Sequence, residues 1–340
     1  MRIAQIAPPW TPVPPPLYGG IELVVDLLSR GLQAAGHEVL LYTVGESTCP
    51  VPRQWVLEQA EGVRIGMAVP EIRHVLHAYE AVQDVDIVHD HTLFGPLYAE
   101  RFPRLATVTT IHGPFNDELT DLYRMVAQRV PVVCVSHDQR AMAPNVPVAR
   151  VIHHGIEASG FPVGRGDGGY CLFLGRMAPE KGAHRAIEAC RKAGVPLLMA
   201  AKMREPWEHA YFAAEIAPHL DDAVRYLGEV PHQEKLDLLG GAMALVNPIR
   251  WHEPFGLVMT EALACGTPVV SFREGAAPEV VEDGRTGFLC ADESEMADAI
   301  GRLGEIDRQA CRAAVEGYFS MERMVDEHIE LFQHVLGSRR

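Results

Sequence analysis

Short, continuously apolar runs alternate with longer amphipathic segments along the first half of the chain. The runs predict buried strands, because a strand covered on both faces is apolar throughout rather than at every second position. The segments between them carry apolar residues at helical spacing. The predicted strands are 3–7, 39–42, 86–89, 106–111 and 131–135, and the predicted helices are 21–35, 72–82 and 117–128.

This alternation stops at a glycine-rich segment, 158–169, which we interpret as a linker, and then restarts. The chain therefore predicts two α/β domains, 1–160 and 168–320, each a Rossmann-like doubly wound parallel sheet. A strongly amphipathic helix follows at 321–336, and the sequence leaves open whether it packs on its own domain or back on the first. The second set of strands is 170–174, 196–201, 224–227, 242–247 and 268–272, with helices at 183–192 and 255–264.

Composition narrows the classes of function. The net charge of −15 argues against a nucleic-acid partner, since phosphate binding needs a basic face. Seven scattered cysteines without a C-x-x-C pair indicate a reducing compartment. Neither a secretory leader nor an apolar run of about 18 residues is evident. We expect a cytoplasmic protein without stable membrane insertion, and the oligomeric state stays open.

The segment 250–262 carries the sharpest chemical signal. Ligands of open α/β sheets lie beyond the carboxyl ends of the strands, and here a strand is followed by Glu253 and then by a helix that begins near Phe255. The start of that helix, with the backbone of Phe255, Gly256 and Leu257, predicts an anion site. Carboxylates at Glu253 and Glu261 would instead bind hydroxyls. The alternative interpretation is a helix-terminal charge at Glu253 and a solvated helix face at Glu261.

A second strand ends in a turn that carries two cations. Arg176 and Lys181 bracket the turn before the next helix and can converge on a pyrophosphate, with the guanidinium binding two oxygens. Either residue taken singly would be read as a surface cation. The turn lacks the glycine spacing and the Lys-Ser/Thr pair of a P-loop.

Together these segments resemble glycosyltransferase family 4, whose members are retaining enzymes of the GT-B fold, with two Rossmann-like domains facing across a cleft. The resemblance implies that Glu253 and Glu261 are the two glutamates of the E-x7-E motif, contacting the donor sugar and the ribose. It also implies that Arg176 and Lys181 bind the diphosphate.

Further segments match the same family pattern over nearly the whole chain. Tyr18, Gly19 and Gly20 resemble the glycine-rich first loop, with the glycine backbone at the donor phosphate and Tyr18 on the acceptor side. Val230 lies in the segment that resembles the base pocket. The segments 275–279 and 284–289 fit the C-terminal pattern of the family.

The histidines that follow predicted strands are a further group of candidate site residues. His112 ends a strand where the family often has an active-site histidine near the donor sugar, and we predict a catalytic role for it. His91 is a candidate on the acceptor side. His89, Asp90 and His91 could be mistaken for a metal cluster, but no third ligand has fitting spacing, so we predict no metal site.

These observations predict a glycosyltransferase that uses a nucleotide diphosphate sugar, such as a UDP- or GDP-sugar, with retention and an unidentified acceptor. A metal cofactor is not required if two cations and a helix terminus stabilise the leaving diphosphate. A sugar-nucleotide epimerase or hydrolase and a non-catalytic sugar-nucleotide sensor are the alternatives. A nicotinamide dehydrogenase is set aside, because no G-x-G-x-x-G follows the first strand.

Overall fold

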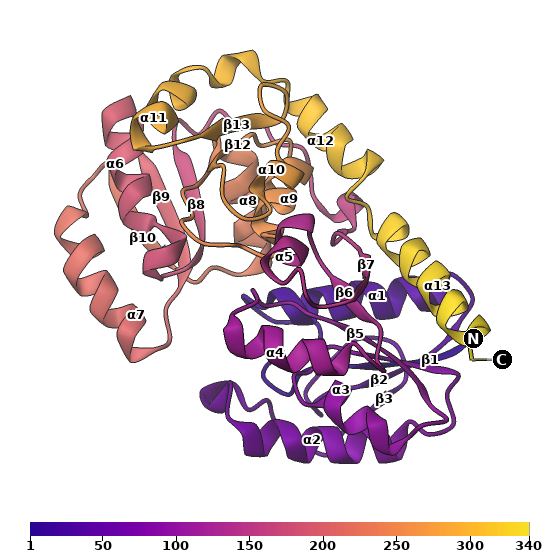
Figure 1. Ribbon diagram of the computed structural model, residues 1–340. Helices are drawn as coiled ribbons and strands as arrows, with labels where there is room; N and C mark the ends of the chain where they lie inside the picture. The colour runs from indigo at the N-terminus through magenta and orange to yellow at the C-terminus, as the bar shows by residue number, and fades with distance from the viewer. Residues whose placement is uncertain (340) are drawn as a thin grey trace. The chain divides into compact units, whose positions relative to one another are not determined.

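The computed structural model describes residues 1–339, and the chain forms two units (Figure 1). The first unit comprises Met1–Gly155 together with the segment that begins at Met321, and the second comprises Ile156–Ser320. No helix within residues 1–339 combines the length and the apolar character needed to cross a bilayer.

The first unit is built on a seven-stranded parallel sheet with the order β3-β2-β1-β4-β5-β6-β7. The direction in which successive strands are added reverses between β1 and β4, and such a reversal is where doubly wound sheets bind ligands. All carboxyl ends of these strands lie along one edge. The strands are β1 (Arg2–Ile6), β2 (Glu38–Tyr42), β3 (Arg53–Gln54), β4 (Ile87–Asp90), β5 (Ala106–Thr110), β6 (Val132–Cys134) and β7 (Val148–Val151).

Helices cover both faces of this sheet: α1 and α13 lie on one face, and α2 and α3 lie on the other (Figure 1). Gly31 on α1 lets α13 approach closely, since a Cβ there would lie 2.5 Å from a methyl group of Val325. The last helix of the chain therefore completes the first unit. The helices are α1 (Gly20–Ala34), α2 (Ala68–Ala81), α3 (Gly95–Tyr98), α4 (Asp117–Val126), α5 (His137–Met142) and α13 (Met321–Gly337).

The second unit repeats the plan with a six-stranded parallel sheet, β10-β9-β8-β11-β12-β13. The reversal here falls between β8 and β11. The two sheets and their flanking helices confirm the predicted pair of Rossmann-like folds. The strands are β8 (Cys171–Arg176), β9 (Leu197–Lys202), β10 (Val224–Gly228), β11 (Leu245–Asn247), β12 (Val269–Phe272) and β13 (Gly287–Cys290).

In the second unit α6 packs with α11, and α9 packs with α8 and α12. The glycine-rich segment that we interpreted as a linker is built into this unit: the amide of Gly164 donates to the carbonyl of Cys265, and that of Gly166 donates to Gly240. The helices are α6 (Ala183–Ala193), α7 (Pro206–Tyr211), α8 (His232–Gly241), α9 (Leu257–Ala264), α10 (Ala277–Val280), α11 (Glu293–Gly301) and α12 (Arg308–Gly317).

Candidate functional site

The two strands that flank the reversal in the second unit carry the predicted donor residues. Arg176 is the last residue of β8, and Lys181 follows five residues later, just before α6. Glu253 lies in the loop between β11 and α9. Because β8 and β11 are parallel neighbours, their loops meet at one edge of the sheet. The structure thus brings together residues that are far apart in sequence.

Lys181 and Glu253 form an ion pair across this edge, with Nζ bonded to Oε2. Both side chains are mostly buried, at 14 % exposure each. Trp251, which the sequence analysis missed, donates from its indole Nε1 to the same carboxylate oxygen at 2.6 Å, and its ring lies 4.7 Å from the Lys181 ammonium. Glu253 is therefore held by two donors, and its burial leaves the charge poorly screened by water.

Backbone contacts fix the loop that carries Glu253. Gly275 has a φ of +55°, and a Cβ there would lie 2.4 Å from the Glu253 amide nitrogen, so only glycine fits. The next amide, of Ala276, donates to the Glu253 carbonyl at 3.0 Å. The amide of Arg250 donates to the carbonyl of Glu180, which ties the β11 loop to the β8 loop. The segment after β12 thus acts as a scaffold for the glutamate.

Arg176 is held by two carboxylates. It bonds to Glu180 at 2.8 Å and lies 3.4 Å from an oxygen of Glu208, which is fully buried. Glu208 is anchored by the amides of Arg204 and Glu205 at the start of α7. The Trp207 ring lies 5.1 Å from the Arg176 guanidinium. About a third of the Arg176 side chain stays exposed, so its guanidinium is oriented while part of it remains accessible to a ligand.

Glu261 is buried inside α9 rather than on a solvated face. It is 3 % exposed and pairs with Lys235 of α8 at 2.5 Å. The alternative interpretation of Glu261 as a solvated residue is therefore wrong. Lys235 was missed, because nothing in the sequence places α8 beside α9.

The helix after Glu253 begins two residues later than predicted. Gly256 adopts a left-handed φ of +82° as the N-cap, and Leu257 is the first residue of α9. Phe255 is buried, with its ring 6.0 Å from that of Phe319. Val230 lies half-buried in the short loop between β10 and α8. The backbone amides at the start of α9 still follow the carboxyl end of β11.

In the first unit, the glycine loop precedes α1. Gly19 is the N-cap of α1 and Gly20 its first residue. A Cβ at Gly19 would lie 2.7 Å from Pro15, so the proline-rich segment requires this glycine. Tyr18 is 39 % exposed just before the helix.

Histidines at the carboxyl edge of the same sheet form a hydrogen-bonded chain. Nδ1 of His91 lies 2.9 Å from Nε2 of His112, and Nε2 of His91 lies 2.8 Å from Oε1 of Gln5. Both ring nitrogens of His91 are engaged and the residue is 5 % exposed, so neither nitrogen is available to an acceptor. Gln5 was missed, although a polar residue in the middle of an apolar strand was a usable signal.

Further histidine rings pack against this chain. The His89 ring lies 4.1 Å from that of His91 and 5.0 Å from that of His328 on α13, and the His154 ring stacks on His112 at 5.4 Å. Burial lowers the pKa of His112 to about 3 and that of His328 to about 4. These five imidazoles, which we call the histidine stack, are therefore neutral at physiological pH.

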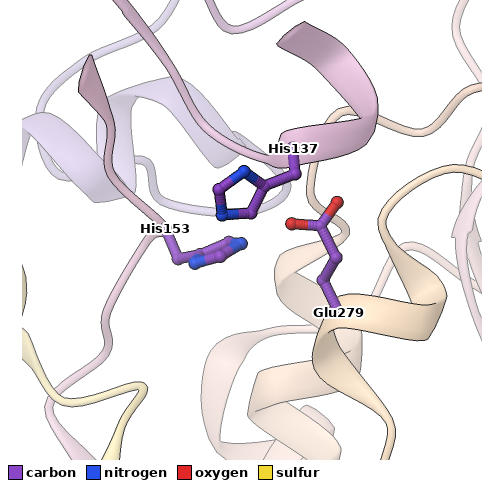
Figure 2. Close-up of side chains that lie close together, drawn as sticks. All are labelled: His137, His153 and Glu279. Carbon is purple, nitrogen blue, oxygen red and sulfur yellow. The ribbon is translucent and has the colours of Figure 1, made fainter. Parts of the chain in front are cut away.

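The residues after β6 and β7 add two more rings to this edge. His137 begins α5 and His153 follows β7, with their rings 5.6 Å apart and nearly perpendicular (Figure 2). Glu279, drawn in the same figure, belongs to α10 of the second unit.

A buried carboxyl group supports the loop after β4. Asp90 accepts from the amide and the hydroxyl of Thr92, both at 2.8 Å, and from the hydroxyl of Tyr79 at 2.8 Å. Burial nevertheless raises the pKa of Asp90 to about 6. Gly95 packs against it so closely that a Cβ there would clash with the carboxylate. Asp90 thus fixes the backbone next to His91.

Two family models match the chain in succession. Glycosyltransferase Family 4 matches residues 18–159, and Glycosyl transferases group 1 matches residues 168–305. A glycogen synthase of Mycobacterium tuberculosis is 29 % identical and covers 88 % of this chain and 85 % of its own length. A D-inositol 3-phosphate glycosyltransferase of Nocardioides is 27 % identical, covering 98 % and 89 %.

Solved structures share the fold over essentially the full length. A sucrose-phosphate synthase of Thermosynechococcus elongatus superimposes with a TM-score of 0.82 at 19 % identity, covering 99 % of both chains. Anabaena HepE, solved in complex with UDP and glucose, has a TM-score of 0.79 at 19 % identity, covering 98 % of this chain and all of that one. These likenesses confirm the GT-B fold.

Proposed function

Because the chain belongs to glycosyltransferase family 4 and is a glycosyltransferase, we propose that its donor is a nucleoside diphosphate sugar bound at the β8–β11 edge of the second unit. The observation that carries the proposal is the set of cations held at that edge. Arg176 and Lys181 both follow β8, on one side of the sheet reversal, and each is held by carboxylates, that of Glu253 coming from the β11 side. HepE, a protein of the same fold, binds UDP.

In this proposal the bound donor breaks the ion pairs and replaces their carboxylates. The diphosphate takes the place of the carboxylates on Lys181 and Arg176, and the amides at the start of α9 add further donors. Glu253, released from Lys181, then accepts from hydroxyls of the sugar. Glu261 serves the ribose, and the loop with Val230 lines the base pocket, as the family pattern implies.

The chemistry proposed is transfer with retention. The bond between the anomeric carbon and the diphosphate oxygen breaks, the acceptor oxygen bonds to the same face, and the leaving diphosphate takes the acceptor proton. Arg176 and Lys181 stabilise the charge that develops on the leaving group, which is the largest contribution a protein makes to such a step. A divalent metal is then not required.

First-unit residues are assigned to the sugar and the acceptor. His112 is the histidine that the family pattern implies near the donor sugar, and Gly19 and Gly20 offer backbone amides. Tyr18 is an acceptor-side candidate. The buried thiols of all seven cysteines fit a reducing compartment, and we propose the cytoplasm.

Calorimetric titration with UDP, GDP and ADP tests the donor site. We expect one nucleotide to bind to the wild type and to bind at least tenfold more weakly to Lys181→Ala, because a charge-assisted contact contributes about 1.5–3 kcal/mol. Lys192→Ala is the matched control, since Lys192 is an exposed lysine that pairs with Glu188 and Ser294 on the surface. Equal weakening in both variants, or no binding of any nucleotide to the wild type, would refute the site.

Product analysis separates transfer from the alternatives. With the bound nucleotide known, its sugar conjugates are incubated with and without acceptor candidates. Sugar release at full rate without any acceptor would indicate a hydrolase, and a changed sugar still attached to the nucleotide would indicate an epimerase. Binding without turnover of any conjugate would indicate a sensor.

A further inference from the structure

We propose that Gln5 and His91 are positioning residues that hold His112 in the tautomer protonated at Nε2, so that its Nδ1 is a hydrogen-bond acceptor for a sugar or acceptor hydroxyl. The inference rests on the proposed function only for the last clause. The tautomer itself follows from three residues of the first unit.

The hydrogen-bonded chain runs from Gln5 through His91 to His112, and its donor direction is set at the buried end, where Gln5 lies. The Gln5 amide turns Oε1 toward His91 and leaves its own Nε2 buried without a hydrogen-bond partner; in this orientation Oε1 can only accept, so Nε2 of His91 carries the proton. A neutral imidazole has one N–H, and Nδ1 of His91 is therefore unprotonated. It must accept from the nitrogen 2.9 Å away, which is Nε2 of His112. The proton of His112 is thereby placed on Nε2.

The surroundings of the His91 and His112 rings keep both of them neutral. The groups packed on the two rings are other imidazoles, His89 on His91 and His154 on His112, with His328 packed on His89 behind them, and all disfavour an added positive charge. Arg323 adds a further cation near His154. Burial, and after it the neighbouring histidines, lowers the pKa of His91 well below its usual value. Neither ring carries a second proton at neutral pH.

The other end of the chain is open to a ligand. His112 is only half-buried, and within residues 1–339 no protein group bonds to its Nδ1. Carbonyls of Ile111 and Gly113, on either side of it, are held by the amide of Gln139 at 2.9 and 2.7 Å. The backbone that carries the ring is thus fixed as well as its tautomer.

This arrangement decides what His112 can do. A ring with a free lone pair accepts from a hydroxyl, and it cannot donate to an oxygen from the same nitrogen. His112 would therefore orient a hydroxyl group by accepting a hydrogen bond from it at Nδ1. His91 itself touches no ligand, which replaces the acceptor-side role expected from its position in the sequence. The same geometry explains why a glutamine lies in the otherwise apolar strand β1.

Nitrogen-15 NMR of the full chain labelled at histidine reads the tautomer directly. For the wild type at pH 7 we expect His112 and His91 to be protonated at Nε2 and unprotonated at Nδ1. Protonation of His112 at Nδ1 would reverse the chain and overturn the proposal. The readout needs neither substrate nor turnover, so it stands or falls separately from the donor site tested by nucleotide titration.

Substitutions at the buried end test positioning. Gln5→Met keeps the length of the side chain and removes the acceptor, so we expect the single tautomer of His112 to become a mixture. With a working assay, kcat should fall about tenfold to a hundredfold, the range for lost support of a functional histidine, while the donor KM stays within about twofold. An unchanged tautomer or an unchanged kcat would overturn the positioning role.

His91→Asn and His91→Leu form the second pair. The asparagine amide can occupy the place of Nδ1 and restore a partner for His112, whereas leucine cannot. We expect asparagine to recover at least part of the kcat that leucine loses, with similar thermal stability in both. Equal loss in the two variants would mean that His91 only fills space.

Discussion

The carboxyl edges of the two sheets have the same topology but differ in the charge of the side chains that they carry. In the second unit, the candidate site residues are charged and paired: Lys181 with Glu253 at the strand reversal, and Lys235 of α8 with Glu261 of α9. In the first unit, they are neutral imidazoles that bond to one another. A fold that offers the same edge twice can therefore specialise each copy by residue type alone. Ion pairs suit an anionic ligand that replaces a carboxylate, and neutral rings suit hydroxyls.

Acidification should produce the largest difference in stability between the two units. Burial lowers the pKa of His112 to about 3 and those of His74 and His328 to about 4, below the usual 6.5. Unfolding lets each take up a proton, so their contribution to stability is complete above pH 6.5 and is lost as pH falls toward 4. The loss is about 1.4 kcal/mol per pH unit for each histidine.

Tryptophan fluorescence during urea unfolding measures this loss unit by unit. Trp10 and Trp55 lie in the first unit, and Trp207 and Trp251 lie in the second. A variant in which Trp10 and Trp55 are the only tryptophans should show a urea midpoint that falls steeply between pH 6.5 and 4.5. An equal fall for the variant that keeps only the second pair would contradict the assignment of acid sensitivity to the histidine stack.

Removing Lys181 should affect turnover far more than folding. Lys181→Ala is expected to lower kcat about a hundredfold to a thousandfold, in line with the loss of one preorganised donor at developing charge. The loss of thermal stability should be smaller than for a buried carboxylate left with no donor at all, because Trp251 still donates to Glu253. Steady-state kinetics and scanning calorimetry on the same preparation check both halves. A large shift in melting temperature with unchanged kcat would make Lys181 structural.

The second ion pair should behave in the reverse way. Lys235→Met leaves Glu261 as a buried carboxylate without its cation, which we expect to cost about 2 kcal/mol, since Lys235 itself is partly exposed. The double variant with Glu261→Gln should recover much of that loss, because the unpaired charge is gone. Urea unfolding of the three proteins measures the coupling. Additive losses would mean that the pair is not coupled.

A smaller change probes how α13 closes the first unit. Gly31→Val places methyl groups where the Val325 side chain already lies, and such overpacking costs about 1–3 kcal/mol. The loss should appear in the unfolding of the first unit, while nucleotide binding by the second unit stays unchanged. Weakened nucleotide binding in this variant would show that the two edges are not independent.

Much of the fold could be predicted from the sequence, because buried parallel strands are local apolar runs. Ten strands were predicted within a few residues of their observed bounds. The strands missed were those with weak local patterns: β3 has two residues, β7 is a partly exposed edge strand, and β13 has four residues after a turn. Short length accounts for β3 and edge exposure for β7, whereas β13 is as long and as buried as β12, which was predicted.

The candidate site was predictable only in part. Residues that directly follow strands, such as Lys181 and His112, could be identified from position and type. Their partners could not, because Glu253 lies 72 residues from Lys181, and Gln5 lies 86 residues from His91. Which carboxylate meets which cation depends on register and packing between elements, and no local pattern encodes it.

The chain order of the first unit has a consequence for its synthesis. The α13 rings of His328 and Phe332 pack on His89, yet the ribosome makes them only after the whole second unit. The second unit is continuous in sequence and can fold as soon as it emerges, whereas the first must wait with its α13-facing surface uncovered. The second unit is thus the first able to complete its fold, and the first unit is the one whose α13-facing surface stays uncovered during synthesis.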